Sequence, residues 1–151
     1  RRRAAERPDA FRPDRAMSLN NLANRLSDLG RREEALEAGQ EALDIYRELA
    51  AERPDAFRPD LASSLGARGS IFRGMEDHGA ATAWFAEALG ILSPMLEATP
   101  EAFAQLTMNL LHDYAQSAKA AGLELDEGLL APIIKALEPL GVFDQEEREK
   151  E

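Results

Sequence analysis

Few side chains in this sequence are of the types that perform acid–base, nucleophilic or metal chemistry. The chain has no cysteine, so it has no thiolate nucleophile, no thiolate metal site and no disulfide. His78 and His112 are its two histidines, and they lie far apart, whereas a metal site needs clustered ligands such as a histidine pair four residues apart. No glycine-rich phosphate loop or nucleophile elbow is present. We therefore expect no enzyme activity, no metal and no cofactor.

Acidic side chains dominate the charge, and the formal net charge is −10. Paired acids such as Glu33-Glu34 and Glu146-Glu147 are interpreted as solvated charges at a helix start and in a tail. An acidic balance argues against a nucleic-acid or anionic-membrane partner, because both need a basic surface. No apolar run approaches the roughly 20 residues that span a bilayer. The absence of cysteine is compatible with the cytoplasm, where we expect the protein to work.

A run of amides is the pattern best suited to binding. Asn20, Asn21 and Asn24 lie within five helical positions, which is an unfavourable choice for helix propensity alone. A carboxamide donates and accepts hydrogen bonds at once, so a row of them can hold an extended peptide backbone whatever its side chains. The same residues could instead be solvated surface groups or link adjacent helices. Both interpretations stay open at this point.

The elements that would position these side chains belong to a repeat. The stretch AERPDAFRPD occurs at residues 5–14 and again, letter for letter, at 51–60, and Pro8, Pro54 and Pro100 are separated by equal intervals of 46 residues. The same offset aligns Leu19 with Leu65 and Leu111, Ala23 with Gly69 and Ala115, Ala35 with Ala81, Ala42 with Ala88, and Leu43 with Leu89. Such a match of small residues with small and large with large indicates a duplicated unit.

Each unit is expected to be a pair of helices. Apolar residues recur every three or four positions from Leu19 through Leu22 and Leu26 to Leu29, after which Gly30 ends the first helix and Arg31-Arg32-Glu33-Glu34 begins the second. The duplicated stretch is expected to be a stiff connector, because a proline inside a helix removes a backbone hydrogen bond. The expected helix N-caps are Asp14 and Asp60, and the residues expected to fill the junctions are Phe11, Phe57 and Phe103.

The unit resembles the tetratricopeptide repeat, which reads W-x2-L-G-x2-Y, then A-x3-F and a closing P, over about 34 residues. The matching spacings here are Leu19-x2-Leu22-Ala23-x2-Leu26 and Leu65-x2-Arg68-Gly69-x2-Phe72, followed by Ala81-x3-Phe85. The string LNNLA at residues 19–23 resembles the long-helix subtype of kinesin light chain and of many bacterial regulatory proteins. Two departures stand out: Arg68 occupies an apolar position, and Glu76 replaces Gly30, which predicts a re-routed turn.

The resemblance implies an all-α solenoid of helix–turn–helix units that binds a protein or an extended peptide in a concave groove lined by the first helices. The residues expected to bind peptide are Asn20, Asn24, Ser63, Ser70, Arg73, Asn109, His112 and Gln116. Trp84 is interpreted as half-buried packing. The alternative function is a structural module that self-associates into a homo-oligomer with an empty groove.

The expected organisation is a remnant of a preceding repeat with its connector at 1–15, repeats at 16–60 and 61–104, a degenerate third repeat with a capping helix at 105–141, and an acidic tail at 142–151. The cap is predicted from the apolar residues Leu129, Leu130, Ile133, Ile134, Leu137 and Leu140. The chain opens Arg1-Arg2-Arg3 without an initiating methionine or an apolar signal region, so we expect a piece of a longer protein.

Overall fold

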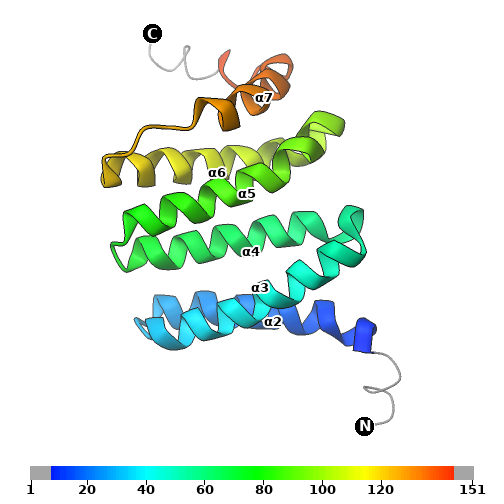
Figure 1. Ribbon diagram of the computed structural model, residues 1–151, viewed down its shortest axis with the longest axis vertical. Helices are drawn as coiled ribbons and strands as arrows, with labels where there is room; N and C mark the ends of the chain where they lie inside the picture. Colours follow the sequence, from blue (N-terminus) through cyan, green and yellow to red (C-terminus); the bar gives the residue numbers. More distant parts are fainter. Residues whose placement is uncertain (1–7, 145–151) are drawn as a thin grey trace.

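The computed structural model describes residues 8–144, which form six α-helices and a short 3-10 helix. The elements are α2 (Pro8–Asp28), α3 (Arg32–Glu52), α4 (Pro54–Gly74), α5 (His78–Ala98), α6 (Pro100–Ala121), α7 (Glu127–Leu137) and η1 (Glu138–Leu140). Figure 1 shows them stacked in chain order, each helix against the next, from the N-terminal to the C-terminal end of the molecule. The predicted all-α solenoid of helix–turn–helix units is confirmed.

The duplicated proline stretch is helical, and its interpretation as a connector is wrong. α4 begins at Pro54 and α6 at Pro100, where a proline is favoured because the first N–H of a helix has no intrahelical partner. Pro13 and Pro59 lie inside α2 and α4, each five residues after the proline that begins the helix. Consequently Asp14 and Asp60 are inside α2 and α4, and they are not N-caps.

The 46-residue period therefore has a simple composition. Two helices of 21 residues, a three-residue turn and a single linking residue, Arg53 or Thr99, make up each unit. The additional length over an ordinary tetratricopeptide unit lies in the helices.

The first helix ends in the same way in all three units, although the connection that follows α6 is longer than the other two. Gly30 N donates to Ser27 O at 2.9 Å and Arg31 N to Leu26 O at 2.8 Å, which satisfies the last carbonyls of α2. Glu76 N and Asp77 N make the equivalent bonds at 2.9 and 3.0 Å, and Gly122 N and Leu123 N make them at 3.2 and 2.8 Å. The expectation of a re-routed turn at Glu76 is wrong, because this residue adopts the left-handed conformation of Gly30, with φ 61° against 77°.

Glu76→Gly is expected to raise the free energy of unfolding by about 0.5 kcal/mol. A left-handed residue with a Cβ costs roughly 1–2 kcal/mol, part of which is offset by the larger backbone entropy of glycine in the unfolded chain. Urea unfolding of both proteins measures the difference. Gly30→Ala is the matched reverse change: its new Cβ would meet nothing within 4 Å, so any loss comes from the backbone angle alone. Equal stability of all three proteins would contradict the argument.

The core runs along the stack between the helices. Its largest fully buried side chains include Phe85, Leu43, Leu65, Leu89 and Leu92. The small residues Ala23, Ala35, Ala42, Gly69, Ala81 and Ala88 are buried, as the repeat predicts. Close approach of helices at these positions is therefore confirmed for the first two units.

Three predicted core positions are exposed. Leu22 on α2 is 47% exposed, and Leu29, the first residue after α2, is 71% exposed. Their face corresponds to the face of α4 that packs on α3, and no helix precedes α2 within residues 8–144. Ala115 on α6 is also exposed, because the 11-residue α7 packs mainly on α5 and does not pair along α6 as a full second helix would.

The junctions and the ends follow the prediction in part. Phe57 and Phe103 are half-buried against the core, while Phe11 is 53% exposed. In α7, Ile133 and Leu137 are fully buried in the core cluster. Residues 1–7 of the predicted remnant and connector at 1–15, and residues 145–151 of the predicted acidic tail at 142–151, lie outside the described residues. No helix of the described part is both long and apolar enough to cross a membrane.

Candidate functional site

The predicted binding residues are distributed along the first helix of each unit. Asn24, Ser63, Ser70, Asn109, His112 and Gln116 are exposed, while Asn20 and Arg73 are half-buried. Asn20 and Asn24 lie on α2, Ser63, Ser70 and Arg73 on α4, and the other three on α6. The repeat thus places polar side chains at corresponding positions, such as Asn24, Ser70 and Gln116, on the first helices of three successive units.

Asn20 connects two helices. Its Oδ1 accepts a hydrogen bond from Ser64 Oγ of α4 at 3.4 Å, and Ser64 is buried. Of the two interpretations that the sequence left open, the link between adjacent helices holds for this residue. Asn24, one turn further along α2, is exposed, and its side chain makes no hydrogen bond within residues 8–144.

Arg73 is engaged in an ion pair between units. Its Nη1 donates to Asp113 Oδ1 of α6 at 2.9 Å, and its guanidinium lies 5.7 Å from the ring centroid of Phe85. Both side chains of the pair are partly buried, so water screens their attraction less than it would on an open surface. Sequence reasoning missed Asp113, because a pairing across repeats depends on the distance between helices that share no local pattern.

A hollow of about 440 Å³ opens between α2 and α4 near their C-terminal ends. It is lined by Asn24, Ser27 and Asp28 of α2 and by Ser70, Ile71, Arg73 and Gly74 of α4. The structure therefore brings three predicted residues together, Asn24, Ser70 and Arg73. The remaining ones lie elsewhere on α2, α4 and α6. The sequence analysis did not select Asp28 or Gly74 for the site, although both continue the exposed stripe of Asn24 and Ser70 by one turn.

Arg68 of α4 does not line this hollow, and it contacts residues of α3 and α5. Its guanidinium lies 5.0 Å from the Trp84 ring centroid and 5.6 Å from that of Phe72, and these two rings stack with their centroids 6.2 Å apart. Nη1 donates to the Leu36 carbonyl of α3 at 3.2 Å. Trp84 is half-buried, as predicted. Arg68 is therefore accommodated at a position that is usually apolar because its guanidinium packs over two aromatic rings.

The pKa of Arg68 is lowered from its usual value. Burial of the guanidinium is the largest cause, the positive charge of Arg47 adds to it, and Asp44 acts in the opposite direction. The residue still carries its charge at neutral pH, because an arginine side chain starts from a very high pKa. Its contacts with Phe72 and Trp84 are consequently cation–π contacts.

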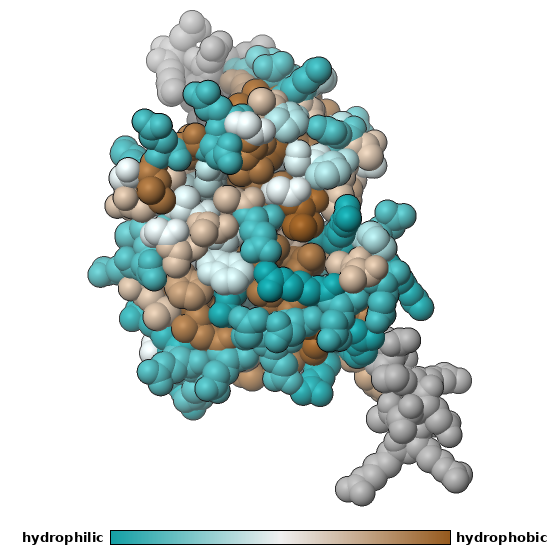
Figure 2. Space-filling model, viewed as in Figure 1, coloured by the Kyte–Doolittle hydropathy of each residue, from teal (hydrophilic) through white to brown (hydrophobic). Residues whose placement is uncertain are grey.

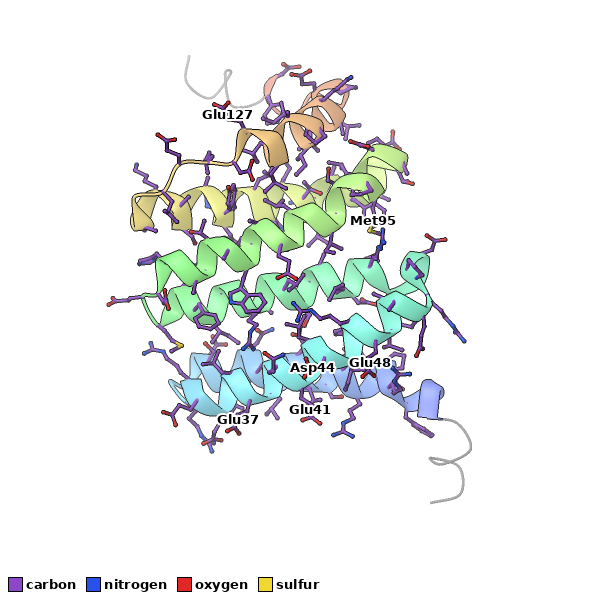
Figure 3. The ribbon with its side chains drawn as sticks, viewed as in Figure 1. Glu37, Glu41, Asp44, Glu48, Met95 and Glu127 are labelled. Atoms are coloured by element: carbon purple, nitrogen blue, oxygen red, sulfur yellow. The ribbon has the colours of Figure 1, made fainter. Side chains whose placement is uncertain are left out.

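The outer face of α3 carries a row of acids. Figure 3 shows Glu37, Glu41, Asp44 and Glu48 on successive turns, and in Figure 2 hydrophilic residues cover the part of this face where α2 and α3 lie. Three of the four have partners: Arg12 binds Glu48 at 2.8 Å, Arg15 binds Glu41, and Gln40 Nε2 donates to Asp44 Oδ1 at 2.8 Å. Within the described residues, no group of three or more histidines and acids is arranged to hold a metal ion.

Comparison with known families gives a match for one section. Residues 15–55 match a family model described as Tetratricopeptide repeat, and they span most of α2 and all of α3. The match supports a tetratricopeptide repeat family for this chain. Such repeats are generally non-catalytic scaffolds that mediate interactions between proteins. Searches of curated proteins and of solved structures gave no match.

Proposed function

We propose that this chain binds a segment of another protein, in extended conformation, along the exposed polar stripe of α2, α4 and α6. The observation that carries this proposal is the hollow between α2 and α4, where Asn24, Ser27 and Ser70 present hydrogen-bonding groups beside Ile71. The side chains of Asn24 and Ser70 have no hydrogen-bond partner among residues 8–144, so both can bond a peptide backbone. A ligand site of this kind needs no catalytic group.

We further propose that the chain works as a section of a longer bacterial regulatory or signalling protein of the long-helix tetratricopeptide subtype. The support is the LNNLA string at residues 19–23 and the 21-residue helices, which exceed what an ordinary unit of about 34 residues can hold. A cytoplasmic location agrees with a chain that has no cysteine.

Gly74→Met is expected to reduce peptide capture about tenfold. A Cβ at Gly74 would meet only Ser27 Oγ, at 4.0 Å, so a long side chain can extend into the hollow without a backbone clash. The methionine side chain would displace the peptide from the hollow, and a tenfold loss of affinity corresponds to roughly 1.4 kcal/mol of binding free energy. The measurement is the binding of capped octapeptide pools of random sequence, followed by fluorescence polarisation.

Gly90→Met is the matched control for this experiment. Gly90 is exposed on α5, a Cβ there would meet nothing within 4 Å, and it does not line the hollow. The control is expected to bind the pools like the parent. Equal binding by the two methionine variants would place the peptide elsewhere, and a parent that binds no pool would refute the proposed function.

Self-association is the second candidate function. Phe11, Leu22 and Leu29 are exposed. The helical spacing of Phe11 and Leu22 brings them to one face of α2, and Leu29 follows directly after the last residue of that helix. Sedimentation equilibrium of the parent and of Leu22→Asp distinguishes this alternative. A mass that rises with concentration in the parent alone would favour it over peptide binding.

A further inference from the structure

The charges of the side chains that line the hollow between α2 and α4 favour the binding of a positively charged group. It is lined by the Asp28 carboxylate, by the neutral side chains Asn24, Ser27 and Ser70, and by one base, Arg73. The positive charge of Arg73 is balanced by Asp113 at 2.9 Å. Asp28 is exposed and has no hydrogen bond or ion pair within the described residues. The uncompensated charge at the hollow is therefore negative.

The helices add to this negative charge. α2 ends at Asp28 and α4 ends at Gly74, and both residues line the hollow. The C-terminal end of a helix carries a partial negative charge, so two such ends and a carboxylate act in the same direction. Of the bases nearest to Asp28 in sequence, Arg31 is held by Glu34 at 2.6 Å, and neither Arg25 nor Arg32 lines the hollow.

We propose that this hollow recognises the guanidinium or ammonium group of an arginine or lysine in the bound peptide, with Asp28 as its counter-charge. The inference rests on the proposed function and specifies the ligand at that same site. Asn24, Ser27 and Ser70 supply acceptor oxygens for the remaining N–H groups of the cation. A hollow of about 440 Å³ holds one long side chain while the peptide backbone stays at the rim.

The test uses three octapeptide pools that are identical except for a central arginine, citrulline or glutamate. Citrulline keeps the shape of arginine without its charge. The parent is expected to bind the arginine pool about fivefold more tightly than the citrulline pool, and the glutamate pool least, which is the effect of one solvent-accessible ion pair. The preference is expected to narrow as salt is raised, because salt screens exposed charges.

Asp28→Asn is expected to abolish the preference for arginine over citrulline while binding of the citrulline pool stays unchanged. The variant removes a negative charge from a helix C-terminus, which favours the helix, so unfolding does not account for the loss. The matched control is Glu37→Gln on the outer face of α3 (Figure 3), which removes the same charge from an exposed side chain with no partner among residues 8–144. It is expected to keep the parent's preference.

The outcomes separate this inference from the proposed function. If the parent binds arginine and citrulline pools equally, the cation preference is wrong and the peptide site stands. If Glu37→Gln lowers the preference as much as Asp28→Asn, the overall charge of −10 is responsible and the assignment to Asp28 is overturned. If the parent binds no pool, both the site and its specificity are refuted.

Discussion

Phe85→Ala is expected to lower the free energy of unfolding by about 4 kcal/mol. Phe85 is fully buried in α5, and its ring lies against the backbone of Gly69 in α4 and beneath the guanidinium of Arg73. Truncation removes the ring from the contact between the two helices of one unit and leaves a cavity, because Gly69 has no side chain to fill it. Phenylalanine-to-alanine changes in cores cost roughly 3–5 kcal/mol.

Urea-induced unfolding followed by circular dichroism measures this loss. Phe57→Ala is the control, because Phe57 is an aromatic residue of the same repeat that is only half-buried against the core. Its loss is expected to be less than half as large, in proportion to the apolar area that it buries. A Phe57→Ala variant that is destabilised as strongly as Phe85→Ala would contradict this account of the core.

The same contact shows how far the repeat pattern predicts packing. The 46-residue offset pairs Ala23 with Gly69 and Gly39 with Phe85, so two small residues in the first unit become a small and a large one in the second. That exchange is visible in the sequence. The sequence does not show what fills the space beside Gly39. The atoms nearest to a Cβ at that position include Arg68 Nη1 at 3.6 Å and Ile71 Cδ1 at 3.8 Å, and both residues belong to the next unit.

The prolines illustrate a different limit. Their spacing identifies the period of the repeat. The rule that a proline ends a helix, however, predicted a connector at residues that form the first turns of α4 and α6 in the structure. Pro54 and Pro100 begin these helices, and Pro59 follows five residues later at the loss of one backbone hydrogen bond, which the packing of a 21-residue helix outweighs. Among these three prolines, local propensity is therefore outweighed at Pro59 alone, whereas Pro54 and Pro100 lie where a proline is favoured.

The candidate site was predictable as a stripe and not as a hollow. Helical periodicity placed Asn24 and Ser70 on exposed positions, and the structure agrees. The hollow itself depends on the gap between two helices from different units, and the engagement of Arg73 depends on Asp113 of a third. Such distances between units follow from packing in three dimensions, to which a one-dimensional pattern gives no access.

Gly69→Ala is expected to lower the free energy of unfolding by about 2 kcal/mol. A Cβ at this position would lie 2.7 to 2.9 Å from three ring atoms of Phe85, and that ring is fully buried and cannot move aside. Gly90→Ala is the matched control inside α5, where a Cβ meets nothing within 4 Å, and it is expected to gain about 1 kcal/mol from helix propensity. Two alanines of opposite effect would separate the clash from propensity.

A double-mutant cycle then assigns the loss to the ring. In Gly69→Ala combined with Phe85→Leu, the smaller side chain leaves room for the new Cβ, so the double variant is expected to lose at least about 1 kcal/mol less than the two single losses together. Additive losses would mean that the effect of Gly69→Ala comes from the backbone at position 69 and not from a clash with the Phe85 ring. Coupled losses would mean that the second unit is held together by a glycine and a phenylalanine whose sizes are matched, so that neither residue can change without the other.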